Sequence, residues 1–398
     1  MGMGPLKGIR ILDLSTMIAA PFGATLLADF GAEVIKIEMP NRGDSLRSMG
    51  PFKGDEPLRW PALARNKKSL TLDLHGEEGQ AILKKLIAKS DVIIENFRPG
   101  TLEKWGLSYE ILKAANPDII LVRVSGYGQT GPYAHKAGFG TPATAFSGFT
   151  YLHGYTDRPP ISPSFSLVDY ITGVYVAFAT STALYYRDAN DGKGQMVDIG
   201  LYESVFRMME FLVADYDQNG VIKERSPGLS GHSSPAGTFQ TKDGHWVVLV
   251  TSSDRTFERL AAAMNREDML EDERFYTNKV RLENFNLTNG IVADWVKAYQ
   301  RDELQKKLDE FGVPISPIIS IEDIFNNEQY KARENIVEID HPRLGKIKMP
   351  GVVPKFSETP GAIMNVGPDL GEHNEHILKE LIGLTDEEIK SLKNKEVI

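Results

Sequence analysis

The chain has 398 residues, of which 41% are hydrophobic and 25% are charged, which is typical of a soluble globular protein of two or three domains. Its net charge of −9 argues against a nucleic-acid partner or an anionic membrane partner. Because it contains no cysteine, disulfides, a thiolate nucleophile and Cys-ligated zinc are all excluded.

Strands and helices alternate in the first 130 or so residues. The expected strands are 8–14, 32–38, 69–74, 91–95 and 119–124, and the expected helices are 21–30, 77–89 and 109–115. This spacing indicates right-handed crossovers and a doubly wound layer. We therefore expect an α/β fold with a Rossmann-like first part.

Two long helices are expected next, at Asp169–Arg187 and Leu201–Tyr216. A hairpin with its turn at Lys242–Gly244 and several charged helices follow. The chain is expected to end in a helix with a capping box at Thr385 and Glu388. The predicted organisation is a large domain from residues 1–200, a linker helix at 201–226, a small α+β domain at 227–311, and a linker that returns to the large domain at 312–398.

Targeting segments are not expected. No apolar run approaches the roughly 20 residues that span a bilayer, and the start of the chain lacks the apolar core of a signal peptide. The prediction is a cytoplasmic protein without a membrane partner.

Two apolar runs end abruptly in polar loops rich in Gly and Pro, at residues 92–100 and 125–132. In an open α/β sheet, ligands bind to the loops that leave the carboxyl ends of the strands. Asn96 and Phe97 offer an amide and a ring to a ligand, and Arg98 and Lys104 follow closely for phosphate. These loops therefore predict a ligand site.

Three familiar site types are disfavoured. The loop 15–21 lacks the G-x-G-x-x-G of dinucleotide-binding folds. His373 and His376 have helical spacing but no evident third metal ligand, which favours a solvated helix start. Ser125 does not lie in a nucleophile elbow and is interpreted as a turn residue.

Asp169 stands where a polar segment enters a long apolar helix. From the residues alone, a helix N-cap is the favoured interpretation. The alternative is a carboxylate that the helix dipole and backbone donors keep ionised, placed to act as a nucleophile toward a thioester. Gly173, four residues later, indicates close approach of a ligand or tight helix packing.

Several ordered blocks resemble the class III CoA-transferases, the group that includes formyl-CoA transferase, carnitine CoA-transferase and α-methylacyl-CoA racemase. The blocks are Gly8–Leu14, Gly31–Glu38, Asn66–Ser69, Glu95–Gly100, Gly126–Pro132, Gly192–Gln195 with Asp198, and Leu370–His373. The resemblance runs nearly from end to end.

This resemblance implies a Rossmann-like large domain formed by both chain ends, a smaller domain on linkers, and two subunits interlocked as rings in a homodimer. It implies acyl-CoA and a free carboxylic acid as substrates, Asp169 as the residue that forms anhydride and CoA-thioester intermediates, and no metal or tightly bound cofactor. The matching CoA-binding positions are Met17, Ile18, Ala19, Leu72, Asn96, Phe97, Lys104 and Lys136. From the residues alone, the two lysines would be solvated surface charges.

The departures from the family pattern narrow the expected activity. Met39 stands where formyl-CoA transferase has an arginine, so Arg42 or Arg47 is expected to replace it. Phe139 stands in the segment where racemase members place a histidine, which disfavours two-base racemisation. The segment from Asp157 to Asp169 resembles members that handle succinyl-CoA or other dicarboxylic acids.

Two alternatives to CoA transfer stay open from the sequence. One is an acyl-CoA racemase or epimerase. The other is a non-catalytic CoA-binding subunit of a heteromeric transferase.

Overall fold

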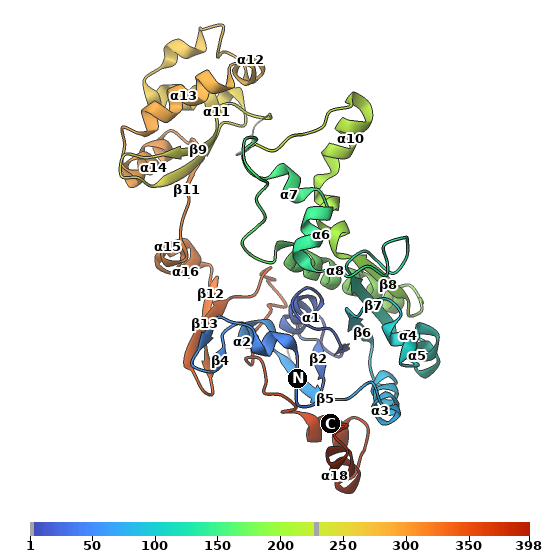
Figure 1. Ribbon diagram of the computed structural model, residues 1–398. Helices are drawn as coiled ribbons and strands as arrows, with labels where there is room; N and C mark the ends of the chain where they lie inside the picture. The colour runs from blue at the N-terminus through green and yellow to red at the C-terminus, as the bar shows by residue number, and fades with distance from the viewer. Residues whose placement is uncertain (1–3, 227–230) are drawn as a thin grey trace. The chain divides into compact units, whose positions relative to one another are not determined.

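The computed structural model describes residues 4–226 and 231–398. The chain forms two compact units, whose elements are labelled in Figure 1. The large unit comprises residues 4–150, 162–221 and 332–398, and the small unit comprises residues 151–161, 222–226 and 231–331. The amino-terminal and carboxyl-terminal segments therefore fold together.

Six parallel strands form the central sheet of the large unit, in the order β5-β2-β1-β6-β7-β8. They are β1 (Arg10–Asp13), β2 (Glu33–Glu38), β5 (Lys67–Thr71), β6 (Val92–Glu95), β7 (Ile120–Ser125) and β8 (Met196–Gly200). The chain adds strands on one side of β1 and then, from β6 onward, on the other side. This is the order of dinucleotide-binding folds, which hold ligands where the order reverses. The predicted parallel α/β layer is confirmed.

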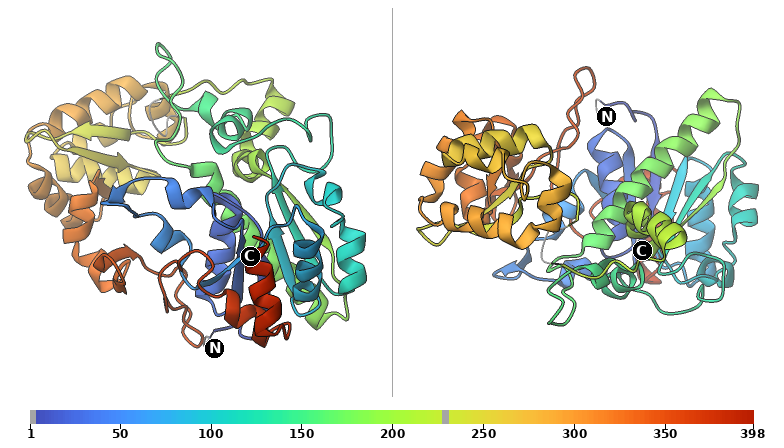
Figure 2. Two further views of the ribbon diagram at one scale, coloured as in Figure 1. Left: turned by 60° about the horizontal axis from the view of Figure 1, so that its bottom comes forward. Right: turned by 90° about the horizontal axis from the view of Figure 1, so that it is seen from above.

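One face of this sheet is apolar. Leu12, Ile35 and Leu70 are fully buried in a cluster that also contains side chains of five helices. These helices are α3 (Glu77–Ile87), α4 (Thr101–Lys104), α5 (Tyr109–Ala115), α17 (Asn374–Glu380) and α18 (Asp386–Asn394). Burial of each such side chain stabilises the fold by about 1.5–3 kcal/mol. Figure 2 shows the carboxyl-terminal helices beside strands from the amino-terminal half.

Successive side chains of a strand point to opposite faces of the sheet. The face opposite the apolar one carries buried charged side chains. Lys67 Nζ lies 2.9 Å from Asp13 Oδ2, and Lys36 Nζ lies 3.3 Å from Asp44 Oδ2. Although burial opposes ionisation, the charges of Lys36 and Lys67 lower the pKa of Asp13. Removing one member of such a network leaves an uncompensated buried charge, so we infer that it holds the loop after β1 firmly.

Helices α1 (Ala19–Asp29) and α8 (Leu167–Ala189) pack closely against each other. A Cβ on Gly173 would come within 2.8 Å of the Ala19 carbonyl oxygen and 2.6 Å of the Phe22 ring. Of the two roles considered for Gly173, tight helix packing is therefore the one observed. The absence of a side chain lets the start of α8 approach the start of α1.

Helix α8 also changes one expectation. It is long enough to cross a membrane, with a mean hydropathy of 1.3, so the prediction that no apolar stretch approaches that length was wrong. A single helix of this kind is weak evidence for a membrane, because core helices of soluble proteins pass the same test.

The region predicted as one helix at 201–216 is divided. It contains α9 (Leu201–Phe206), the 3-10 turn η2 (Arg207–Met209) and α10 (Glu210–Asn219). Residues 201–221 group with the large unit, whereas a separate linker helix at 201–226 was expected. Residues 227–230, where the small domain was expected to begin, lie outside the described residues.

The small unit is built on a three-stranded antiparallel sheet. Strands β9 (Ala236–Gln240) and β10 (Trp246–Val250) form the predicted hairpin, and β11 (Ile315–Pro317) pairs with the other edge of β10. The helices that follow the hairpin are α11 (Asp254–Met264), α12 (Asn278–Glu283), α13 (Phe285–Val296) and α14 (Arg301–Glu310). Because β11 belongs to this sheet, the unit extends beyond the expected boundary at 311, to residue 331.

The returning segment contains the hairpin of β12 (Ile336–His341) and β13 (Gly345–Pro350). The capping box of α18 forms as predicted, with Thr385 and Glu388 bonded reciprocally. His373 precedes α17, and its Nδ1 lies 3.3 Å from the Ser69 amide. This histidine therefore joins the returning segment to the central sheet.

Candidate functional site

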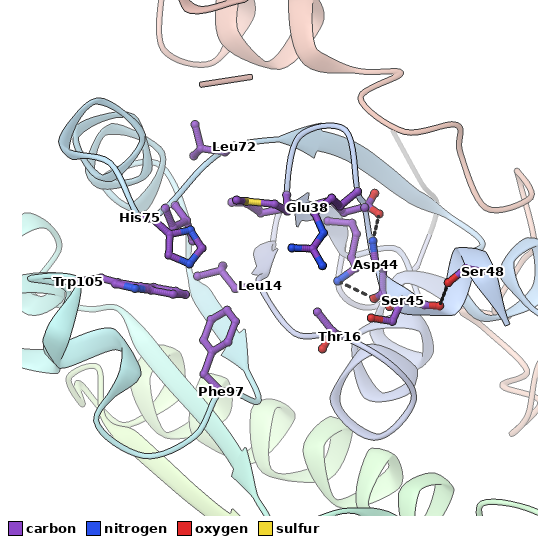
Figure 3. Close-up of a pocket in the computed structure, with 16 residues that line it drawn as sticks. Leu14, Thr16, Glu38, Asp44, Ser45, Ser48, Leu72, His75, Phe97 and Trp105 are labelled. Carbon is purple, nitrogen blue, oxygen red and sulfur yellow. Dashed lines mark hydrogen bonds and ion pairs between the residues drawn. The ribbon is translucent and has the colours of Figure 1, made fainter. Parts of the chain in front are cut away.

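A cavity of about 340 Å³ lies at the carboxyl ends of β1, β2, β5 and β6 (Figure 3). Thr16 after β1, Met39 after β2, Leu72 after β5 and Phe97 after β6 all line it. It spans the point where the strand order reverses, which is where open α/β sheets bind ligands. Of the two loops in which the sequence predicted a ligand site, the loop 92–100 contributes Phe97 to this cavity, whereas no residue of 125–132 lines it.

One wall of the cavity is aromatic. The Trp105 ring stands edge-on to Phe97 at 5.0 Å and to His75 at 4.9 Å between centroids. The side chain of Met39 and the guanidinium of Arg42 contribute polarisable and positive groups to the same cavity. Such a lining suits a ligand that carries a flat, electron-rich ring and phosphate groups. Aromatic side chains stack on the ring, and cations pair with the phosphates.

The loop after β1 is held from two sides. The Asn96 side chain accepts from the Thr16 amide at 2.8 Å and donates to the Thr16 carbonyl at 2.7 Å. The Met17 amide donates to Asp44 Oδ1 at 3.0 Å, and Met17 adopts a positive φ of 70°. Such backbone conformations are costly and are found where the surrounding structure enforces them. Both polar ends of Asn96 thus position the loop, whereas the sequence predicted an amide offered to a ligand.

The loop after β6 is fixed by a buried carboxylate. Glu95 Oε2 accepts from the Phe97 amide at 2.6 Å, and Arg123 joins Glu95 Oε1 to Glu103 at 2.6 and 2.7 Å. Burial raises the pKa of Glu95 to about 7, although Arg123 opposes this rise. Glu103 lies in α4 (Thr101–Lys104), so the Arg123 guanidinium ties the helix that carries Lys104 to the sheet.

Asp169 is the third residue of α8, after the N-cap residue Ser166. The N-cap interpretation was therefore wrong by three positions, because Leu167 and Val168 already belong to the helix. The carboxylate was expected to be kept ionised by the helix dipole and by backbone donors. Burial raises the pKa of Asp169 to about 6, and a hydrogen bond to its own backbone lowers it only in part.

The backbone of Gly140 presses against this carboxylate. Gly140 is the first residue of α6 (Gly140–Phe146). A Cβ built on Gly140 would overlap Asp169 Oδ2 and would lie 3.0 Å from Cγ. The carboxylate therefore occupies the space that any larger residue at position 140 would fill.

Two contacts bring the start of α8 near the loop after β1. The Tyr170 ring meets Phe22 edge-on at 5.0 Å, and Gly173 lies against Ala19. Ile18 belongs to a buried apolar cluster on which Tyr170 packs. The carboxylate of Asp169 and the loop 16–19 therefore belong to one region of the large unit.

Comparisons with known proteins give the same family as the sequence resemblance. The profile of CoA-transferase family III matches residues 6–374. The chain belongs to CoA-transferase family III.

Its relatives resemble it over their full lengths. It shares 43% identity over 396 residues with the succinyl-CoA–D-citramalate CoA-transferase of Chloroflexus aurantiacus, covering 99% of this chain and 98% of that protein. It shares 46% over 398 residues with the beta subunit of the succinyl-CoA–L-malate CoA-transferase of the same organism, with coverage of 99% and 98%. A CaiB/BaiF family protein from Brucella suis superimposes with a TM-score of 0.83 at 32% identity, covering 96% of this chain and 100% of that one. The protein is therefore a CoA-transferase.

The predicted CoA-binding residues of this CoA-transferase fall into three groups. Leu72 and Phe97 line the cavity. The residues of the second group do not line the cavity but lie within three positions of a residue that does, and they are Met17, Ile18, Ala19, Asn96 and Lys104. Arg98 and Lys136 are exposed and do not line it, and Lys136 Nζ rests 3.3 Å from the centroid of the Tyr133 ring. Ile18 and Ala19 are buried.

Sequence reasoning missed several residues of this CoA-transferase site. Trp105 follows Lys104 directly, and an aromatic residue beside a phosphate-binding candidate was a usable signal. Asp44 gave no such signal, because its role depends on the Met17 amide, 27 residues earlier. Gly140 was considered only as part of the segment where racemases carry a histidine.

Proposed function

We propose that this CoA-transferase moves CoA between a dicarboxylic acyl donor, such as succinyl-CoA, and a second carboxylic acid, with Asp169 as the covalent catalyst. The observation that carries the proposal is the placement of the Asp169 carboxylate. It is largely removed from water at the start of α8, against the Gly140 backbone and close to the loop after β1. A carboxylate with a pKa of about 6 is ionised at neutral pH, yet it is less stabilised than one in water.

The chemistry is a series of exchanges between carboxylate and thioester. Asp169 attacks the thioester carbonyl carbon and expels the CoA thiolate, giving an aspartyl–acyl anhydride. The thiolate then attacks the aspartyl carbonyl of this anhydride, which releases the donor acid and leaves an aspartyl-CoA thioester. The acceptor carboxylate expels the thiolate again to form a second anhydride. Attack of the thiolate on the acceptor acyl carbon yields the new acyl-CoA and frees Asp169.

Each tetrahedral intermediate develops an oxyanion that needs preorganised donors. Gly140 and Thr141 open α6, and first-turn amides have no acceptor within their own helix. Since Gly140 also touches the Asp169 carboxylate, we propose these two amides as oxyanion donors.

The dicarboxylic acyl donor is proposed from the relatives. The two Chloroflexus proteins are named as succinyl-CoA-dependent transferases acting on citramalate and malate, and a mouse protein 33% identical is named succinyl-CoA:glutarate CoA-transferase. Every acid in these names carries two carboxyl groups. A panel of such acids is the appropriate acceptor screen.

Trapping the covalent intermediate tests the proposal. Incubation with succinyl-CoA followed by borohydride or hydroxylamine should modify one carboxyl group, that of Asp169, as read by peptide mass spectrometry. Asp188 lies on the same helix, is exposed and serves as the internal control. A modification that appears on another residue, or on none during turnover, would contradict the assignment.

Arg42 is proposed to replace the family arginine that is missing at Met39. Arg47 is already occupied, because its Nε and Nη2 each lie 2.8 Å from Glu38 and its guanidinium stacks 3.7 Å from the Trp60 ring. Arg42 lines the cavity, and no side chain within residues 4–226 and 231–398 pairs with its guanidinium.

Arg42→Ala is expected to raise the KM for succinyl-CoA about tenfold with little change in kcat, since a phosphate contact contributes to binding alone. Arg47→Ala should instead lower the melting temperature, because Glu38 loses its partner. Steady-state kinetics and thermal melts separate the two effects. An unchanged KM in Arg42→Ala would contradict the proposal.

The interlocked homodimer is also proposed. Large apolar side chains of α8, η2 and α10 are exposed, among them Phe178 at 65%, Tyr185 at 69% and Met208 at 57%. An exposed apolar surface of this extent is typical of an interface. Sedimentation velocity should give the mass of two chains. A single-chain mass would contradict the proposal, and a requirement for a related chain would match the relatives named as alpha and beta subunits.

A further inference from the structure

Arg59 stands beside the helix start that carries Asp169. It immediately precedes the short helix α2 (Trp60–Leu63) and is exposed. The next residue, Trp60, is buried in the apolar cluster with Ile18, and Tyr170 packs on that same cluster. The backbone at Arg59 is thereby anchored to the wall formed by the loop after β1 and the first turn of α8.

The guanidinium of Arg59 has no partner. Within residues 4–226 and 231–398 no carboxylate lies in ion-pair range of it, and no side-chain hydrogen bond reaches it. The nearest arginines on either side of it in the sequence both form ion pairs, Arg47 with Glu38 and Arg65 with Asp29. Arg59 therefore contributes no ion pair to the packing of the large unit.

The charge of Arg59 nevertheless reaches the site. Burial raises the pKa of the Tyr170 hydroxyl, the positive charge of Arg59 lowers it, and the charge of the neighbouring Asp169 raises it. The positive charge of Arg59 therefore acts on Tyr170, the residue that directly follows Asp169 in α8.

A dicarboxylic acyl group poses an electrostatic problem at this place. Its free carboxylate must approach the negative Asp169 on a chain whose net charge is −9. Removing such a charge from water is unfavourable in free energy unless the charge is paired. A guanidinium matches a carboxylate with two parallel hydrogen bonds. A guanidinium that forms no ion pair and whose charge acts on Tyr170, the residue after Asp169, offsets this repulsion.

We propose that Arg59 binds the distal carboxylate of the dicarboxylic acid while the opposite end of that acid reacts at Asp169. This assignment rests on the proposed transferase function and specifies how the enzyme selects its acid. Arg59 is thereby a specificity-determining residue, and monocarboxylic acids of the same length leave it without a partner.

The experiment compares two exchange reactions that differ only in that carboxylate. One follows labelled succinate into succinyl-CoA, and the other follows labelled butyrate into butyryl-CoA, each at substrate concentrations below KM. Arg59→Ala is expected to lower kcat/KM for succinate exchange about 100-fold, because one partner of a charged pair is removed. Butyrate exchange should stay within about twofold, and Arg59→Lys should restore part of the succinate rate, since a lysine keeps the charge but loses the bidentate geometry.

Lys53 is the matched control, since it is an exposed cation in the nearby two-stranded hairpin of β3 (Phe52–Lys53) and β4 (Glu56–Pro57). Lys53→Ala should leave both exchanges unchanged. An equal loss of both exchanges in Arg59→Ala, or no loss of either, would overturn the assignment. A wild-type enzyme inactive in both exchanges would instead overturn the proposed function itself.

Discussion

Replacement of Asp169 by asparagine should reduce the transferase kcat by about 10⁴-fold or more, because a neutral amide cannot form the anhydride and nucleophile deletions have effects of this size. The substitution keeps the shape of the side chain. Exchange of CoA between succinyl-CoA and an acceptor acid is the measurement. The alanine variant, which cannot revert by deamidation, should show the same loss.

The stability of the variant separates catalysis from folding. The pKa of Asp169 is raised to about 6 from 3.8, so ionisation of this carboxyl group destabilises the folded state. The favourable contribution of the protonated carboxyl is present below pH 4 and is lost as the pH rises through about 6. At pH 7 the asparagine variant should therefore melt at the same temperature or higher.

The exposed Asp188 of the same helix provides the matched control. Asp188→Asn should keep wild-type turnover. Full activity of Asp169→Asn, or equal losses in both variants, would contradict the mechanism.

Gly140→Ala should lower kcat by about 100-fold, because displacing a catalytic group by about 1 Å has an effect of this order. The added Cβ would overlap Asp169 Oδ2, and the carboxylate would have to turn away from the bound thioester. The backbone at Gly140 does not have a positive φ, so the alanine itself is not strained. Single-turnover formation of the covalent intermediate should slow in parallel with kcat.

The control for this substitution is Gly290→Ala. A Cβ at Gly290 in α13 would meet no atom within 4 Å, and alanine favours a helix interior over glycine. This variant should retain activity and gain slightly in stability. If Gly140→Ala were as active as Gly290→Ala, the contact between Gly140 and the carboxylate would have no role in catalysis.

Much of the large unit could be predicted because its signals are local. Helix α5 was predicted with the observed bounds, and α3 begins at the predicted residue, Glu77, because amphipathic spacing and turn residues act within a few positions. The division of the helix at 201–216 by η2 carried no signal of this kind. The start of α8 was predicted two residues late, because Leu167 and Val168 were assigned to the preceding segment.

The candidate site was predictable in its chemistry but not in its supports. The loop after β6 and Asp169 were singled out from the residues themselves, whereas the loop after β1 and most CoA-binding positions came from the family resemblance. Asp44 and Arg59 did not, because the role of Asp44 depends on the distant Met17 amide and the lack of an ion pair at Arg59 depends on the fold. Trp105 was missed although it directly follows Lys104. The amide of Asn96 was assigned to a ligand, yet it bonds Thr16 across 80 residues.

The amino-acid sequence by itself determined the parallel α/β layer and the family, since hydrophobic periodicity and ordered motifs are properties of the chain read in order. It also predicts the type of nucleophile. Only the tertiary structure decided which arginines form ion pairs and which do not. Arg47 and Arg65 are paired by carboxylates that folding brings to them, whereas Arg59 and Arg42 form no ion pair with any residue that the structure describes. Pairing depends on distances across the fold, and burial sets the proton affinity of Asp169. Neither quantity is contained in the spacing of residues along the chain.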